Sequence, residues 1–176
     1  MLKNQLGQIH NTAYIDGANL DKGIQHLGWE LDYSRFRTWL KERHRVSDAY
    51  LFLGYIPKFD DLYKRLTIFG YNLVFKEVVL DANQLPKGNC DADLVLEAVR
   101  VFYEDTYDKA VLVSSDGDYA RLVNFLYVHG RLKIILSPTD YCSRLLRKMT
   151  PPLTYLSQMQ SLLEAKKKNS PLETKH

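Results

Sequence analysis

The stretch from Val111 to Leu122 reads VLVSSDGDYARL and carries the main clue to the fold. A short apolar run leads into two serines, and Asp116 and Asp118 then stand on either side of a glycine. The apolar, β-branched run predicts a buried strand, so the two acids come where that strand should end. No basic residue stands beside them. The pattern therefore raises the question of what offsets two carboxylates at the end of a buried strand.

Outward from this stretch, segments typical of strands alternate with segments typical of helices. We expect strands at 12–17, 48–56, 72–80, 109–114, 132–137 and 153–157, the last of them at an edge. We expect helices at 34–44, 59–70, 91–102, 118–130 and 141–149, and a loop at 81–90. This alternation predicts an α/β domain with a mostly parallel central sheet.

Length and composition predict one folded domain. The chain has 176 residues, of which 45% are apolar and 26% charged, which favours a packed core over disorder. We place the domain at 10–160 and predict that 161–176, rich in lysine, is a solvated tail. The net charge of +3 permits contact with nucleic acid without indicating it.

The chain lacks the patterns of secreted and membrane proteins. Cys90 and Cys142 lie far apart and form no CxxC pair, which argues against a disulfide scaffold or a zinc site and favours a reducing compartment. The first ten residues contain no long apolar run of the signal-peptide kind. No stretch approaches the roughly 18 apolar residues of a membrane span. We therefore expect a cytoplasmic protein without a membrane partner.

Aspartates follow several of the predicted strands. Asp16 ends the first strand, Asp116 and Asp118 follow the strand with the opening motif, and Asp91 and Asp93 begin a helix. In a parallel α/β sheet the functional site lies outside the carboxyl ends of the strands. All five acids can therefore converge at one edge of the sheet.

Gathered carboxylates repel one another, and a cation removes that penalty. Oxygen ligands suit hard ions, so the five aspartates predict a site for Mg²⁺ or Mn²⁺. A single aspartate after a strand is more often a helix N-cap, but one helix start needs only one cap. Asp91 precedes the apolar residues Leu94 and Val95 by three and four positions, which turns it toward the buried side of its helix.

Three motifs together resemble the NYN domain family, which belongs with the PIN-like nucleases and includes the LabA-like bacterial proteins. The motifs are YIDGANL (14–20), KGNCDADL (87–94) and SSDGDYARL (114–122), and they occur in the family's order. The resemblance covers about residues 12 to 140. It implies a PIN-like, three-layer α/β/α sandwich and metal-dependent cleavage of RNA.

The resemblance also implies roles for single residues. Asp16 matches the first-strand acid with Asn19 as its companion, and Asp116 and Asp118 match the paired acids of the last motif. Asp91 matches the acid of the family's KGxD segment. Here that segment is one residue longer than KGxD, which leaves Asp91 and Asp93 as alternatives. The direction in which the helix presents them favours Asp91, with Asp93 as the alternate ligand.

Other residues near the acids are candidates for binding substrate. Lys87 matches the family's lysine and would contact the phosphate backbone, unless it is a solvated loop residue. Ser115, like its neighbour Ser114, could donate hydrogen bonds to the acids. Tyr119 stands beside the acids and is a candidate for contacting a nucleotide. Arg121 lies three residues after Asp118 and either pairs with it or meets a substrate phosphate.

These observations predict a metal-dependent ribonuclease that hydrolyses RNA phosphodiester bonds. The alternative is an RNA-binding or regulatory protein that has kept the acid cluster with little turnover. The residues do not distinguish RNA from single-stranded DNA, an endonuclease from an exonuclease, or one metal from two. They also leave open whether the chain forms a homodimer.

Overall fold

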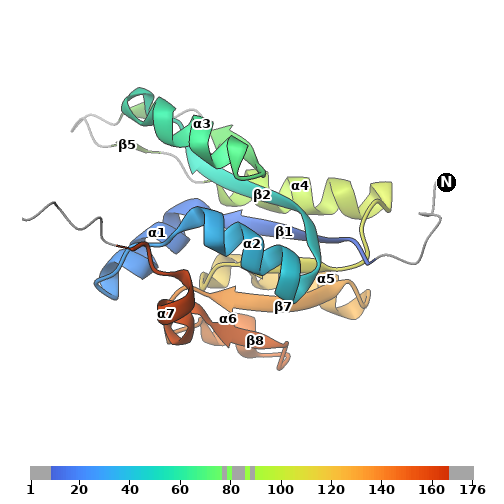
Figure 1. Ribbon diagram of the computed structural model, residues 1–176. Coiled ribbons are helices and arrows are strands. Elements are labelled where there is room, and N and C mark those ends of the chain that lie inside the picture. The colour runs from blue at the N-terminus through green and yellow to red at the C-terminus, as the bar shows by residue number, and fades with distance from the viewer. Residues whose placement is uncertain (1–8, 77–78, 81–85, 88–89, 167–176) are drawn as a thin grey trace, which may run out of the picture.

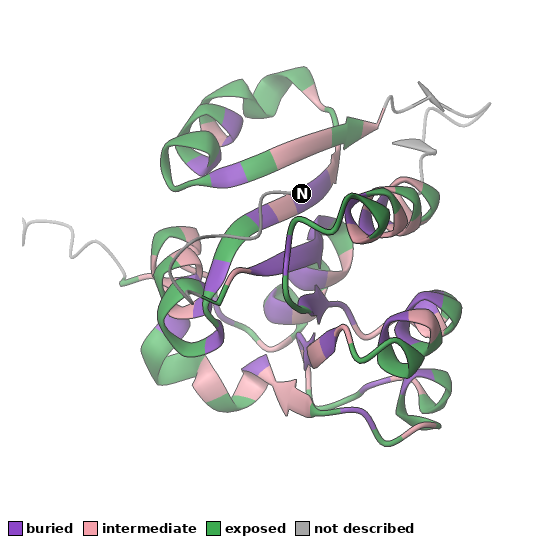
Figure 2. Ribbon diagram, turned by 90° about the vertical axis from the view of Figure 1, so that its right-hand side faces the viewer, coloured by how far each residue is buried: buried purple, intermediate pink, exposed green. Residues whose placement is uncertain are grey.

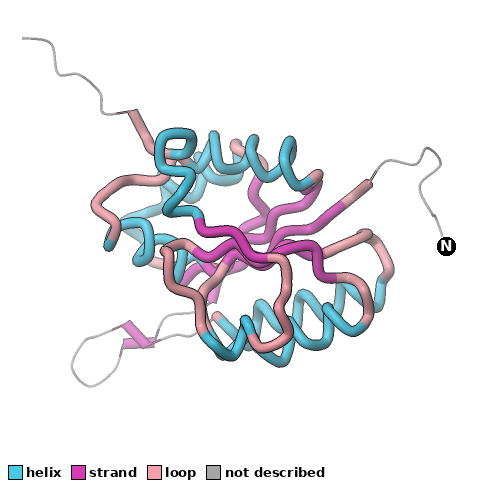
Figure 3. The backbone as a smooth tube through the Cα atoms, turned by 90° about the horizontal axis from the view of Figure 1, so that it is seen from below, coloured by secondary structure: helices cyan, strands magenta, loops and turns pink. Residues whose placement is uncertain are grey.

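A six-stranded sheet lies between two layers of helices in the computed structural model of the chain (Figure 1). The structure describes residues 9–76, 79–80, 86–87 and 90–166, with the side chains of 79–80 and 86–87 left out. Seen from below, helices cover both faces of the sheet (Figure 3). The predicted three-layer α/β/α sandwich with a parallel sheet is confirmed.

The order of the strands decides where a site can form. The strands run β3-β2-β1-β6-β7-β8 across the sheet, and every neighbouring pair is parallel. Their bounds are β1 Asn11–Asp16, β2 Val46–Gly54, β3 Tyr71–Lys76, β6 Ala110–Val113, β7 Leu132–Ser137 and β8 Leu153–Tyr155. The chain moves outward from β1 to β3, then crosses to the other side of β1. The topological switch point therefore lies between the carboxyl ends of β1 and β6, where ligands bind in open α/β sheets.

Each face of the sheet is covered by its own set of helices. One face carries α1 Gly17–His26, α2 Tyr33–His44, α3 Asp60–Ile68 and α7 Gln160–Leu163. The other carries α4 Asp91–Glu104, α5 Ala120–Val128 and α6 Arg144–Arg147. Short 3₁₀ turns are η1 Pro57–Phe59, η2 Gly117–Tyr119 and η3 Leu156–Met159, and a small antiparallel pair joins β4 Val79–Leu80 to β5 Pro86–Lys87. No helix in the described ranges is both long and apolar enough to span a bilayer.

Alternation along the strands separates two apolar cores. In β1, Ile15 belongs to the core under α1 and α2, whereas Tyr14 belongs to the core under α4 and α5. In β6, Val113 and Leu112 divide in the same way. Figure 2 shows buried residues on the central strands and on the inward sides of the helices. Since side chains alternate along a strand, Asp16 follows Tyr14 and faces the α4 and α5 side.

The first helix was missed at the sequence level. Helix α1 contains Gly17 and Gly23, which lower helix propensity and hide the pattern. Tertiary contacts need both glycines, because a Cβ on Gly17 would lie 2.7 Å from the Phe52 carbonyl oxygen and one on Gly23 would lie 2.6 Å from Pro138. Close packing therefore overrides propensity here.

Several boundaries also differ. The strand expected at 72–80 ends at Lys76, and the helix expected at 141–149 is only Arg144–Arg147. Two residues of the tail expected at 161–176 pack against the domain, because Leu163 is buried and the Ala165 amide donates to the Glu30 carbonyl at 2.8 Å. The remainder of that tail, 167–176, lies outside the described residues.

Candidate functional site

Asp16 stands at the junction of β1 and α1 and is nearly buried, with 8% of its surface exposed. Its Oδ1 accepts a hydrogen bond from the Asn19 amide at 3.0 Å, so the residue caps α1 as a lone aspartate often does. Its Oδ2 lies 3.4 Å from the Ser114 hydroxyl, which donates to it. Capping therefore occupies only one of the two oxygens, and the other faces the end of β6.

Tyr119 joins Asp16 to Asp91. Its hydroxyl oxygen lies 3.2 Å from Asp16 Oδ2 and 2.5 Å from Asp91 Oδ1, and the side chain is completely buried. Burial, the charge of Asp16 and the hydrogen bond to Asp91 raise the pKa of the Tyr119 hydroxyl. The hydroxyl therefore stays protonated and acts as a donor held between two acids.

Burial raises the pKa of Asp16, and the nearby carboxylates of Asp91 and Asp116 raise it further. Hydrogen bonds from the Asn19 amide and the Tyr119 hydroxyl act in the opposite direction. The negative charge on Asp16 is thus costly in the folded protein. A nearby cation would offset that cost.

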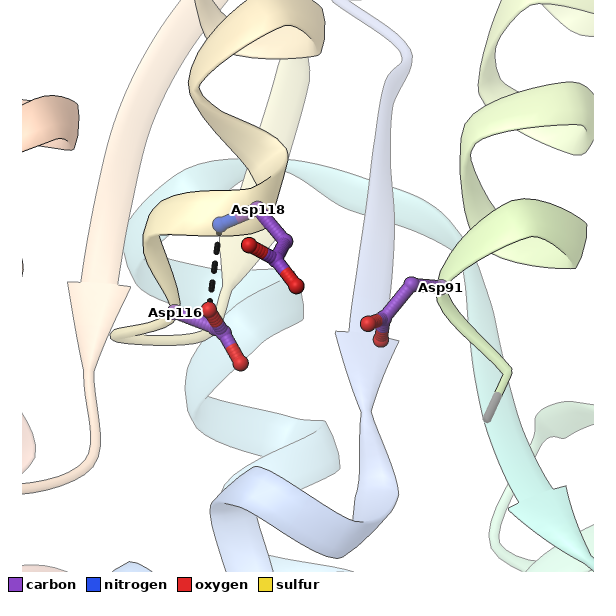
Figure 4. A group of neighbouring side chains, drawn as sticks. All are labelled: Asp91, Asp116 and Asp118. Atoms are coloured by element: carbon purple, nitrogen blue, oxygen red, sulfur yellow. Dashed lines mark hydrogen bonds between the residues drawn. The ribbon is translucent and has the colours of Figure 1, made fainter. Parts of the chain in front are cut away.

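Three other carboxylates converge in front of this buried acid. One ligand oxygen each from Asp91, Asp116 and Asp118 lies within 4.8 Å of the other two. Figure 4 shows Asp91 at the start of α4 facing Asp116 and Asp118 on the turn after β6. Asp116 Oδ1 accepts a hydrogen bond from the Asp118 amide at 3.0 Å, which fixes that turn (Figure 4). Segments far apart in the sequence therefore build one acidic group at the switch point.

The donor set fits a hard divalent cation. All three groups are carboxylates, the ligand type that Mg²⁺ and Mn²⁺ prefer. Within the described part of the chain, no lysine, arginine or histidine forms an ion pair with Asp116 or Asp118. Both reach solvent, which leaves room for an ion and a substrate.

Asp93 does not join this group. Its carboxylate points to β3, where Lys76 Nζ lies 3.7 Å away. Asp91 and Asp93 are two positions apart on a helix, so their side chains diverge by about 200°. Of the two alternatives left by the sequence, the structure brings Asp91 to the other acids and ties Asp93 to a lysine.

Asn19 is fixed against the loop that carries the acids. Its Oδ1 accepts hydrogen bonds from the Ser115 amide at 2.9 Å and from the Ser115 hydroxyl at 3.1 Å. Because the backbone amide can only donate, the atom facing it must be the oxygen. The Asn19 NH₂ group therefore points elsewhere, and no other described residue accepts a hydrogen bond from it.

The family model for the NYN domain matches residues 12–156, which is most of the chain. The chain belongs to the NYN domain family. The family predicted from the three motifs is thus confirmed. NYN domains are nuclease-like and generally bind nucleic acid.

The chain is also similar to one curated protein and to one solved structure. The low amplitude and bright protein LabA of Synechococcus elongatus is 26% identical over 170 residues, which cover 91% of this NYN chain and 90% of the relative. A crystal structure of a protein of unknown function from Vibrio parahaemolyticus has a TM-score of 0.72 at 18% identity. That match covers 87% of this chain and 96% of the other, and it shows a shared fold.

The candidate substrate-binding residues of this NYN domain differ in their positions. Tyr119 is not on the surface, so a base cannot stack on it, and its hydroxyl positions two acids instead. Arg121 is exposed, and no ion pair to Asp118 is found in the described ranges. Ser115 uses its amide and hydroxyl on Asn19. The side chain of Lys87 lies outside the described residues.

The sequence did not reveal that the segment before α6 supports the acidic turn. The Ser143 amide donates to the Ser115 carbonyl at 3.1 Å. A Cβ built on Gly117 would lie 2.6 Å from the Ser143 hydroxyl oxygen, so the two segments pack closely. Nothing in the local pattern around Ser143 signals this contact, because it depends on the crossover from β7.

Proposed function

We propose that this NYN domain is a metal-dependent ribonuclease that hydrolyses RNA phosphodiester bonds. The observation that carries the proposal is the group of Asp91, Asp116 and Asp118, whose ligand oxygens lie within 4.8 Å of one another at the switch point. RNA as the substrate rests on the resemblance of the three motifs, and the cytoplasm is the proposed location.

The three converging carboxylates would hold Mg²⁺ or Mn²⁺. A bound ion supplies Lewis-acid stabilisation of charge on a phosphoryl oxygen and favours deprotonation of water near neutral pH.

The surrounding residues keep these ligands in place. The Tyr119 hydroxyl orients Asp91 through its 2.5 Å hydrogen bond and links it to Asp16. The negative charge of Asp16, directly behind this group, adds to the attraction for a cation. A carboxylate whose partner orients it needs no reorganisation when charge develops on the substrate.

Two groups are suited to the substrate itself. The Asn19 NH₂ group can donate to a phosphate oxygen, since its carbonyl oxygen is held by Ser115. Arg121 follows the acidic turn on α5 and is exposed, so it can pair with the next phosphate. Lys87, on β5 before α4, remains a candidate for the same role.

The test is cleavage of labelled single-stranded and structured RNAs by the full chain in Mn²⁺, Mg²⁺ or EDTA. Asp91→Asn and Asp116→Asn remove one ligand each without changing side-chain volume. Asp93→Asn is the matched control, because it neutralises an acid on the same helix that pairs with Lys76. We expect metal-dependent cleavage by the wild type and the control, and its loss in the two ligand variants.

Other results would change the conclusion. RNA retained in a binding assay without cleavage in either metal would favour the alternative, a binding or regulatory protein. Cleavage that persists in both ligand variants would contradict the assignment of the acids.

A further inference from the structure

A cavity lies at the amino ends of β1 and β2, at the opposite ends of the strands from the acids. It has a volume of about 640 Å³ and opens between the residues before β1 and the end of α2. Its lining includes His10, Arg37, Lys41 and Arg45, together with the apolar side chain of Ile9. No aspartate or glutamate of the described chain is among the lining residues. The volume falls within the roughly 300–1,000 Å³ of ordinary small-molecule sites.

Arg37 gives this cavity a fixed positive charge. Its guanidinium donates to three carbonyl oxygens, those of Gly70 at 2.9 Å, Val46 at 3.2 Å and Ser47 at 2.5 Å. These contacts hold the side chain between the beginnings of β2 and β3. A guanidinium has five N–H donors, so about two remain for a ligand.

Lys41 and Arg45 add two exposed cations. Neither forms a hydrogen bond or an ion pair through its side chain with another described residue. Lys41 lies in the last turn of α2, where the helix dipole already favours a cation. The same dipole favours a cation at Arg45, which directly follows the helix.

Arg45 follows α2 with a φ of 57°, in the left-handed region where glycine is the usual residue. At the end of α4, Asp105 has the same conformation with a φ of 51°. The Asp105 carboxylate accepts a hydrogen bond from the Arg131 guanidinium at 2.8 Å. The guanidinium of Arg45 has no such partner in the described chain and borders the cavity. The guanidinium of Arg45 is therefore available to a ligand in the cavity.

We propose that this cavity binds the phosphate group of a nucleotide, either free or within an RNA strand. Arg45 and Lys41 would contact the phosphate, and Arg37 would supply fixed charge and its remaining N–H groups. Arginine forks and lysine ammonium groups are the usual partners of phosphate in proteins. Ile9 would pack against the sugar or base. The site is independent of the metal-dependent activity, because it lies at the amino edge of the sheet.

Calorimetric titration of the full chain in EDTA tests this proposal with AMP, adenosine and a single-stranded RNA hexamer. We expect AMP to bind at least about tenfold more tightly than adenosine, because a charge-assisted contact typically has that effect. Arg45→Gly should weaken AMP binding by at least about tenfold while the melting temperature stays the same or rises, since glycine relieves the left-handed backbone. Arg43→Gln is the matched control, because Arg43 is an exposed arginine on the same turn that does not line the cavity.

The outcomes distinguish a free nucleotide from an RNA strand. They also distinguish binding at the cavity from binding at the acidic group. Hexamer binding that weakens in Arg45→Gly and falls steeply with salt identifies an RNA strand, whereas an effect on AMP alone identifies a free nucleotide. Asp116→Asn should leave binding unchanged even if it abolishes cleavage. The proposal is overturned if AMP does not bind, if adenosine binds as tightly, or if Arg45→Gly binds both phosphorylated probes like the wild type.

Discussion

The Tyr119 hydroxyl donates a hydrogen bond to the Asp91 carboxylate at 2.5 Å. The tyrosine comes from the turn after β6 and the aspartate from the beginning of α4, 28 positions away. This contact fixes the direction of Asp91 toward Asp116 and Asp118. The acidic group is therefore supported by a buried donor behind it.

Tyr119→Phe should weaken both the fold and the metal site. The change removes a hydroxyl whose single proton is shared between two acids, and an unmade hydrogen bond to a buried polar group costs about 1–3 kcal/mol. Urea unfolding should show that loss, and titration with Mn²⁺ should show weaker binding. Tyr103→Phe is the control, because Tyr103 is 73% exposed and no effect is expected. Wild-type stability and affinity in Tyr119→Phe would show that the bridge is unimportant.

Asp16→Asn should stabilise the protein at neutral pH while it reduces activity. Burial raises the pKa of Asp16 above its ordinary 3.8, so at pH values between the unfolded and the folded pKa the folded state holds a proton that the unfolded chain has released. The contribution of this proton to the free energy of unfolding is complete below the pKa that Asp16 has in the unfolded chain. It declines as the pH rises through the higher pKa that Asp16 has in the folded protein. The melting temperature of the variant in EDTA should exceed the wild type at pH 7, and the difference should shrink toward pH 3. An equal difference at both pH values would contradict the titration of Asp16.

Mn²⁺ should raise the melting temperature of the wild type. A ligand at one hundred times its Kd stabilises the folded state by about 2.7 kcal/mol. The shift should disappear in Asp116→Asn and Asp118→Asn and remain in Asp93→Asn, whose carboxylate pairs with Lys76. Differential scanning fluorimetry with and without Mn²⁺ measures this. A shift lost equally in the Asp93 variant would place the ion elsewhere.

Gly117→Ala should disturb the acidic turn. Its Cβ would lie 2.6 Å from the Ser143 hydroxyl oxygen, and overpacking of this kind costs about 1–3 kcal/mol. The second change Ser143→Ala removes that oxygen and leaves Leu145 Cδ1 at 3.2 Å and the Ser143 Cβ at 3.4 Å, so it should restore part of the lost stability. Unfolding curves of the wild type, the two single variants and the double variant form a double-mutant cycle. Purely additive losses would show that the contact is not the cause.

His44 should make the fold sensitive to acid. Burial, aided by the charges of Lys133 and Arg43, lowers the pKa of His44 from 6.5 to about 4. The unfolded chain therefore takes up a proton first, and stability is lost as pH falls from about 6.5 to about 4, by up to about 3 kcal/mol. His44→Phe keeps an aromatic ring against Trp39. It should reduce the loss of unfolding free energy between pH 6.5 and pH 4, measured by urea unfolding at each pH. The exposed control His26→Gln should retain the wild-type slope.

The sequence by itself determined the alternation of strands and helices and the family. It did so because short apolar, β-branched runs such as those around Leu112 and Ile135 are typical of buried strands, and because each family motif is a continuous stretch of the chain. It also predicted that acids would meet at one edge, because parallel strands end together. Asp16, Asp91, Asp116 and Asp118 were all named on that basis.

Only the tertiary structure decided which of these acids converge and which lie behind or beside the acidic group. Asp16 lies behind the group because strand alternation and the cover of Tyr119 bury it. Asp93 does not belong to the group, because its side chain diverges from that of Asp91 on the helix. Its carboxylate lies beside Lys76 on β3 instead. The cations Arg37, Lys41 and Arg45 follow one another at four-residue spacing, but the cavity beside them forms only where the residues before β1 lie next to the end of α2. Periodicity is a property of neighbouring residues, whereas a site depends on contacts between segments that the chain order separates.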